Sequence, residues 1–201
     1  MTVIGITGPT GAGKTTVLKE IEALGGAVID CDAVYHEMLE SDRALQESLE
    51  RAFGPLRDGQ GAIDRKKLGA LVFGDPAKLE RLNAIAQRAV VQRTRQMVKE
   101  NRSRGIGLTA IDAFALLESG LADLCTTTVA VLAPAEARVA RIMARDGIPE
   151  EYARLRVRAQ KDEAFYRARC TDVLVNDCGS AAAFTEKARQ ALETILKEER
   201  A

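Results

Sequence analysis

The sequence has few of the residues that build metal centres, disulfide frameworks or aromatic stacking platforms. Its 201 residues include one histidine, four cysteines and no tryptophan, and only 4% are aromatic. The cysteines form no C-x-x-C pair, and a Cys/His zinc site is therefore not expected. Free thiols in a reducing cytoplasm are the plain interpretation. The cysteines are Cys31, Cys125, Cys170 and Cys178.

The chain also lacks an excess of either charge and any long hydrophobic run. Lys plus Arg and Asp plus Glu both total 29, so no overall basic field is present to attract nucleic acid. No apolar run approaches the roughly 20 residues that span a membrane. An apolar segment begins at Val3, which leaves no room for a cleavable signal peptide. We therefore expect a soluble cytoplasmic protein with neither a nucleic-acid nor a membrane partner, folded as one domain over residues 1–201.

The phosphate-binding pattern G-x-x-x-x-G-K-[ST] is present at Gly8–Thr15. Its glycines let successive backbone N–H groups face one concavity, and the positive end of a following helix adds to the attraction for a polyphosphate. Lys14 is expected to reach the β- and γ-phosphates of ATP, and the Thr15 hydroxyl to ligate Mg²⁺. The residues expected to bind the nucleotide are Gly8, Gly11, Ala12, Gly13, Lys14, Thr15 and Thr16.

The segments around this loop indicate the fold class. An apolar strand precedes the loop, and an amphipathic helix expected over Thr15–Leu24 follows it, which is the setting that the motif requires. Five apolar runs separated mostly by helical patterns indicate an α/β fold with a five-stranded parallel sheet. The runs are Val3–Thr7, Ala27–Cys31, Ile106–Asp112, Thr127–Ala133 and Asp172–Asn176. The long, charged gap between the second and third runs is expected to be a helical insertion over about residues 33–103, and Ala181–Glu199 to be a surface helix.

Arginine is concentrated between residues 136 and 169. Ion pairs on a solvated helical surface account for most of these side chains, including Arg138 and Arg158. Arg141 and Arg145 differ because a spacing of four places both on one helix face, shortly before Gly147 ends the helix. Two guanidinium groups beside a phosphate site would stabilise charge on a transferring phosphoryl group.

Carboxylates follow two of the expected strands. If the second strand continues to Asp32, Asp30 and Asp32 point to the same side at the carboxyl edge of the sheet, where ligands bind. One of them would handle an acceptor hydroxyl, although Asp32 as a simple helix N-cap is an alternative. Asp112 resembles the strand-end Asp that supports Mg²⁺, and a role in a cap or turn fits it equally well. The lone His36 fits a structural or exposed position better than a catalytic one.

Several motifs in this order resemble the dephospho-coenzyme A kinase family over almost the whole chain. The Asp30-Cys31-Asp32 strand end follows the phosphate loop. Ile63-Asp64-Arg65, Val72-Phe73 and Asp75-Pro76 then resemble the family pattern I-D-R-x-x-L-x-x-x-V-F-x-D-P, and Leu82-Asn83 follows. Arg141, Arg145, Arg156 and Gln160 resemble its R-x-x-x-R…R-x-x-x-Q lid signature, and Asp172–Asn176 its closing D-x-V-I-x-N. The chain has Gln87-Arg88 where the family carries His-Pro, and Asp112-Ala113-Phe114 in place of D-x-P.

The resemblance implies a three-layer P-loop kinase fold with a helical acceptor-binding insertion and a helical lid over about residues 146–168. It implies transfer of the ATP γ-phosphate to the ribose 3′-hydroxyl of dephospho-CoA, with Asp32 handling that hydroxyl. Lys14 would hold the triphosphate, and Arg141 or Arg145 would balance charge as the lid closes. ATP and Mg²⁺ would be the cofactors, and the protein would be a monomer or small homo-oligomer. Two alternatives stay open: a kinase acting on another nucleoside or nucleotide, and a nucleotide-binding regulatory protein without turnover.

Overall fold

The computed structural model describes residues 1–199, which form two compact units. One unit combines Met1–Ile29 with the chain from Val98 onward, and it contains the sheet and the phosphate loop. The other, Asp30–Met97, is helical. The helical unit overlaps the insertion expected from the sequence, and the organisation as one domain with a lid stays a prediction.

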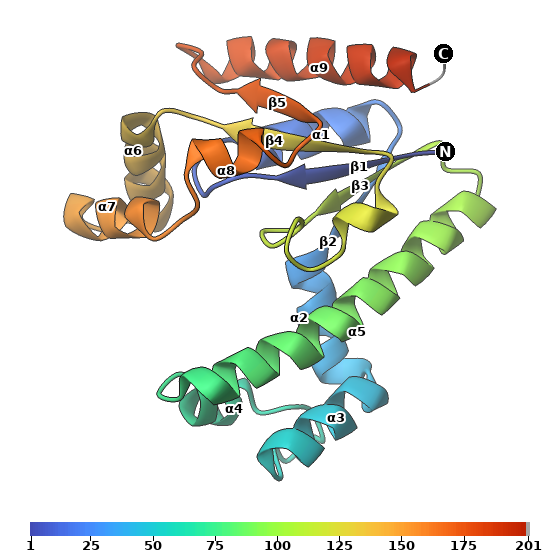
Figure 1. Cartoon of the computed structure of the whole chain (residues 1–201), viewed down its shortest axis with the longest axis vertical. Helices are drawn as coiled ribbons and strands as arrows, with labels where there is room; N and C mark the ends of the chain where they lie inside the picture. The colour runs from blue at the N-terminus through green and yellow to red at the C-terminus, as the bar shows by residue number, and fades with distance from the viewer. Residues whose placement is uncertain (200–201) are drawn as a thin grey trace. The chain divides into compact units, whose positions relative to one another are not determined.

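The first unit is built on a five-stranded, all-parallel sheet with the strand order β2-β3-β1-β4-β5 (Figure 1). Its strands are β1 (Thr2–Thr7), β2 (Ala27–Asp30), β3 (Leu108–Asp112), β4 (Thr127–Leu132) and β5 (Asp172–Val175). The α/β class and the parallel sheet are confirmed, and each strand starts and ends within two residues of its expected position. The apolar runs identified these strands because helices cover the sheet and bury it on both faces.

Helices cover this sheet on both sides. On one face, α1 (Lys14–Ala23) and α9 (Ala181–Glu198) pack Val17, Ile21 and Phe184 against Ile4 and Ile6 of the central strand. On the other face, Tyr166 packs on β4 from α8 (Glu163–Arg167). A 3-10 turn, η1 (Ala122–Leu124), precedes β4. Two further helices, α6 (Ala135–Asp146) and α7 (Glu150–Arg158), pack against each other at the end of the unit shown in Figure 1.

The helical unit consists of α2 (Cys31–Ser41), α3 (Arg43–Phe53), α4 (Arg65–Val72) and most of α5 (Pro76–Ser103). An aspartate precedes each of the first three helices, and its carboxylate accepts hydrogen bonds from backbone N–H groups of the first turn. Those three caps are Asp30, Asp42 and Asp64. Aspartate is a preferred residue at this position, because the first N–H groups of a helix have no partner within it.

Candidate active site

Three glycines set the path of the phosphate loop. Gly8, Gly11 and Gly13 have positive φ angles of 135°, 79° and 112°, a region that side chains other than glycine rarely adopt. A Cβ at Gly8 would lie 2.2 Å from the Val131 carbonyl oxygen, and one at Gly13 would lie 2.6 Å from the Asn176 amide nitrogen. The loop therefore runs so close to its neighbours that a side chain at either position would displace it.

Lys14, Thr15 and Thr16 form the first turn of α1, directly after the loop. The Lys14 ammonium donates a hydrogen bond of 2.7 Å to the Gly8 carbonyl, so its side chain folds back over the loop. The Thr15 side chain is exposed, and the Thr16 N–H bonds to the Gly13 carbonyl. The positive end of α1 and the Lys14 charge thus lie at one place, which favours an anion there.

Two polar side chains hold the loop carbonyls. Arg141, from α6, donates to the Gly11 carbonyl at 3.0 Å and to the Asn176 side-chain oxygen at 3.2 Å. Asn176 is 6% exposed and donates in turn to the Ala12 carbonyl at 2.9 Å. Because the C=O and the next N–H of a trans peptide point in opposite directions, this contact turns the Gly13 N–H to the other side of the loop.

A second contact, which we call the Thr10 latch, joins Thr10, Arg138 and Gln160. The Gln160 side-chain oxygen accepts from the Thr10 N–H at 3.1 Å, and its nitrogen donates to the Thr10 hydroxyl at 2.8 Å. Arg138 donates to the Thr10 carbonyl at 3.0 Å and also to the Gln160 oxygen. Every polar group of Thr10 thus has a partner, either in α6 or in the turn between α7 and α8. Arg138 is only 8% exposed, and this burial lowers the pKa of its guanidinium.

The latch corrects the expectation that Arg138 lies on a solvated surface. Nothing in the composition of this arginine-rich segment distinguishes Arg138, but it lies three residues before Arg141 and so shares its helix face. Sequence reasoning named Gln160 only as part of a signature, and it missed Thr10. A P-loop threonine whose side chain bonds a distant glutamine leaves no local sequence signal.

Arg141 and Arg145 do not reach the same place. The Arg145 side chain is 60% exposed and forms an ion pair of 2.7 Å with Asp146, which also pairs with Arg156 at 2.6 Å. The hydrogen bond from Arg145 holds the pKa of Asp146 below its ordinary value. The structure therefore brings Arg141 to the phosphate loop and places Arg145 in a surface ion-pair cluster.

Asp32 lies in the first turn of α2, in the helical unit. The condition for Asp30 and Asp32 to share a side of β2 is not met: the strand ends at Asp30, one residue before its expected end, and the Asp30 carboxylate accepts from the N–H groups of Asp32 and Ala33 at 2.9 and 3.0 Å. The cap is therefore Asp30, and the alternative that Asp32 serves as the N-cap is wrong. Asp32 is exposed, and among residues 1–199 no side chain or backbone group bonds its carboxylate.

Two further residues singled out from the sequence have clear positions. Asp112 is the last residue of β3, in register with Ile6 of β1, so it lies at the sheet edge where the phosphate loop begins. His36 is exposed on α2, with its ring 5.9 Å from that of Tyr35. Within the described part of the chain, no cluster of three or more His, Cys, Asp or Glu side chains could hold a metal ion, and no helix is long and apolar enough to cross a membrane.

Comparison with known proteins decides the family. The family model described as dephospho-CoA kinase matches residues 2–182. The chain belongs to the dephospho-CoA kinase family. Curated relatives include the dephospho-CoA kinases of Thermobifida fusca, 32% identical over 98% of each chain, and Corynebacterium diphtheriae, 34% identical over 94% of this chain and 95% of the relative. The family resemblance inferred from the ordered motifs is confirmed.

Solved structures share the fold of this chain. The protein TT1252 from Thermus thermophilus superposes with a TM-score of 0.74, at 34% identity, over 98% of this chain and 97% of the other. The dephospho-CoA kinase of Campylobacter jejuni gives a TM-score of 0.72 at 22% identity over 98% of both chains. A shikimate kinase from Acinetobacter baumannii shares the fold, with a TM-score of 0.54 at 18% identity over 98% of this chain and 94% of the other. The fold is that of the P-loop kinases.

Proposed function

We propose that this protein phosphorylates the ribose 3′-hydroxyl of dephospho-CoA with ATP, giving CoA and ADP, the last step of coenzyme A biosynthesis. The observation that carries the proposal is the family match over residues 2–182, together with a complete phosphate loop inside it. The other supports are the Arg141 contacts to that loop and the exposed Asp32 carboxylate. A cytoplasmic location and a monomer or small homo-oligomer accompany this proposal.

The triphosphate of ATP is proposed to bind to the loop residues Gly8, Gly11, Ala12 and Gly13 and to the first turn of α1, with Lys14, Thr15 and Thr16. The loop fits this role because its carbonyls already have partners, which leaves N–H groups of the following turn for the anion. Lys14 would exchange its hydrogen bond with the Gly8 carbonyl for one with a phosphate oxygen, and so carry its charge to the transferring group.

Mg²⁺ fits the residues present, although no acidic cluster lies among residues 1–199 to hold it. Magnesium in nucleotide sites takes few protein ligands and several from phosphates and water, so the exposed Thr15 hydroxyl suffices as the direct protein ligand. When bound, the ion would neutralise charge that develops on the phosphates.

The remaining roles concern the acceptor. Asp32 is proposed to accept a hydrogen bond from the ribose 3′-hydroxyl and then its proton, as a carboxylate with no partner among residues 1–199 can. Arg141 and Arg145 are proposed to balance the charge of the transferring phosphoryl group. The contacts of Arg141 support its role directly, whereas that of Arg145 rests on the family signature and requires it to leave Asp146.

A coupled assay of ADP release tests the proposal. With ATP and Mg²⁺ present, ADP release should depend on added dephospho-CoA, and the product should carry the new phosphate on the ribose 3′-oxygen. A panel of nucleosides and nucleotides at the same concentration is the control. Faster ADP release with a panel member than with dephospho-CoA would identify another acceptor. ATP binding without ADP release under any condition would indicate a nucleotide-binding regulatory protein.

A further inference from the structure

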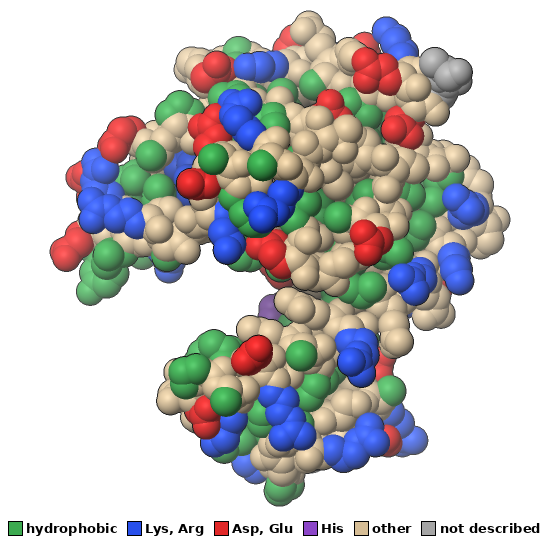
Figure 2. Space-filling model, in the orientation of Figure 1, with side chains coloured by type: hydrophobic (Ala, Val, Ile, Leu, Met, Phe, Trp, Pro, Cys, Tyr) green, Lys and Arg blue, Asp and Glu red, His purple; other side chains and the backbone are tan. Residues whose placement is uncertain are grey.

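Arg141 differs from most arginines of its segment in the groups that accept its hydrogen bonds. Several others pair with carboxylates, and acidic and basic side chains are interspersed on the face of the sheet-containing unit seen in Figure 2. These paired arginines are Arg145, Arg154, Arg156 and Arg167. In the part of the chain that the structure describes, Arg141 has no carboxylate within ion-pair distance. Its acceptors are neutral oxygens of the phosphate loop and of Asn176, so its charge is held in place without being neutralised.

Asn176 connects this charge to the loop. One end of its side-chain amide accepts from Arg141 at 3.2 Å, and the other end donates to the Ala12 carbonyl at 2.9 Å. The backbone N–H of Asn176 donates to the Leu132 carbonyl at 2.7 Å, which extends the pairing of β5 with β4 by one residue. Because the side chain is buried and the backbone is held by the sheet, the amide is fixed in position.

The Gly13 N–H is the group whose direction this amide sets. Gly13 follows Ala12, and the N–H of a trans peptide points away from the carbonyl that Asn176 holds. Among residues 1–199 the Gly13 N–H has no hydrogen-bond acceptor. Gly13 is the N-cap residue of α1, at the end of the helix whose N–H groups bind anions. Asn176 thus holds both an N–H donor and a cation at the phosphate loop.

We propose that Asn176 is a positioning residue for phosphoryl transfer, because its amide orients the Gly13 N–H toward the bound triphosphate and holds the Arg141 guanidinium at the loop. The inference rests on the proposed kinase reaction and adds to it a residue that acts through two others. The two ends of the amide serve different steps. The Gly13 N–H contributes to nucleotide binding, whereas Arg141 contributes when charge develops on the transferring group. Loss of the amide should therefore lower both nucleotide affinity and kcat.

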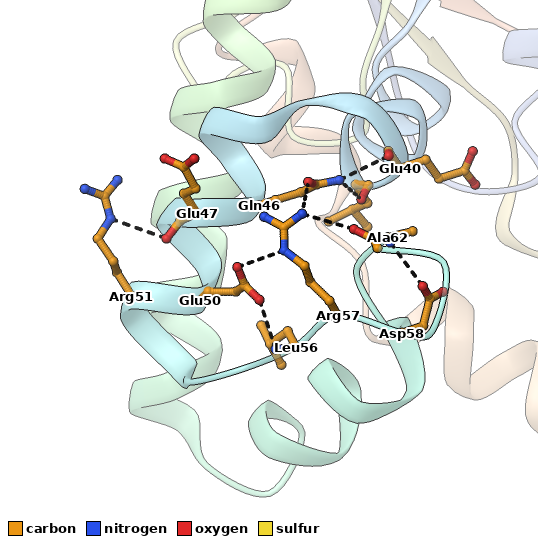
Figure 3. Close-up of polar contacts among 11 residues, drawn as sticks. Glu40, Gln46, Glu47, Glu50, Arg51, Leu56, Arg57, Asp58 and Ala62 are labelled. Atoms are coloured by element: carbon orange, nitrogen blue, oxygen red, sulfur yellow. Dashed lines mark hydrogen bonds and ion pairs between the residues drawn. The ribbon is translucent and has the colours of Figure 1, made fainter.

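Gln46 of the helical unit provides a matched control. Its buried amide donates to the Leu39 and Glu40 carbonyls at 3.0 and 3.1 Å and accepts from Arg57 at 3.0 Å (Figure 3). All of these partners belong to the helical unit. Replacement of either amide by leucine removes the same kinds of hydrogen bond from a buried position, but only at Asn176 do those bonds hold the phosphate loop.

Calorimetry with a non-hydrolysable ATP analogue and Mg²⁺ measures nucleotide affinity in the absence of any acceptor. Asn176→Leu should weaken binding by about 10- to 100-fold, as expected for loss of a hydrogen bond to a charged group, whereas Gln46→Leu should bind within about twofold of the wild type. Both substitutions should lower the melting temperature, because each leaves buried polar groups without partners. Asn176→Ser removes the same contacts without adding bulk and should repeat the loss of affinity.

A double-mutant cycle in the ADP-release assay, with saturating ATP and dephospho-CoA, tests the action through Arg141. Asn176→Leu should lower kcat by about tenfold or more in the otherwise wild-type protein. In an Arg141→Ala background the same substitution should lower kcat by less than about threefold, because the group through which it acts on kcat is gone. A purely structural role would give the same ratio in both backgrounds.

Nucleotide affinity within about threefold of the wild type in both Asn176 variants would overturn the proposal, as would an equal loss in Gln46→Leu or equal effects on kcat in the two backgrounds. Failure of both Asn176 variants to fold would also overturn it, because the residue would then be purely structural. A wild type that binds the nucleotide but releases no ADP with dephospho-CoA would instead refute the proposed reaction. The calorimetric comparison would then still decide whether Asn176 orients the loop.

Discussion

Replacement of Gln160 by leucine should loosen the phosphate loop at Thr10. The substitution removes two hydrogen bonds to Thr10, one to its N–H at 3.1 Å and one to its hydroxyl at 2.8 Å. Each contributes about 1 kcal/mol net, so local opening of the latch should become easier by about 2 kcal/mol. Amide hydrogen exchange measures that free energy directly, and the Thr10 amide should exchange about 30-fold faster in Gln160→Leu.

The chain offers a matched control and an intermediate variant for this experiment. Gln190→Leu removes an exposed glutamine whose side chain bonds Glu186 on the same helix, and it should leave exchange of the Thr10 amide unchanged. Thr10→Val removes the hydroxyl contact alone, so its effect should be about half in free energy. Exchange at Thr10 within threefold of the wild type in Gln160→Leu would show that the latch does not hold the loop.

The proposed kinase mechanism gives three further expectations. Lys14→Ala should nearly abolish phosphoryl transfer with the circular dichroism spectrum unchanged, and activity within a few-fold of the wild type would contradict its role. Arg141→Ala should lower kcat by about 10³-fold, because the group contacts the loop and is proposed to balance the charge of the transferring phosphoryl group. Exposed Arg158→Ala should leave kcat nearly unchanged, and equal effects of the two substitutions would reduce Arg141 to a surface residue. Asp32→Asn should lower kcat by roughly 10²- to 10⁴-fold, as expected for loss of a general base. Its ATP affinity and stability should be normal, because Asp30 and not Asp32 caps α2. Unimpaired turnover would show that Asp32 takes no part in the chemistry.

The sheet and the phosphate loop were predictable from the sequence because local features encode them. A strand covered by helices on both faces has to be apolar along its length. The loop needs glycine at Gly8, Gly11 and Gly13 because the backbone has a positive φ angle at each of them. Boundaries were less certain where two rules compete. Asp30-Cys31-Asp32 fits both a strand end and a helix start, and the preference of aspartate for the N-cap decides for a helix from Cys31.

The contacts that each arginine makes were not predictable, because they depend on residues that are distant in the sequence. Arg138 and Arg145 are in the same helix and have the same side chain, yet Arg138 contacts Thr10 and Gln160 whereas Arg145 pairs with Asp146. The helical period shows on which face of the helix each arginine lies, but it does not show what that face packs against. Only the placement of α6 beside the loop distinguishes them.

This placement also connects the first and last residues of the proposed lid signature, Arg141 and Gln160, to the phosphate loop. Arg141 and Arg138 bond carbonyls at Gly11 and Thr10, in the half of the loop before Lys14, and Gln160 bonds the N–H and hydroxyl of Thr10. A lid that moves during turnover would have to break the contacts of Gln160 while α6 remains in place. Thr10 is therefore the loop residue whose hydrogen bonds should respond first to lid movement, and its amide is the probe of that step.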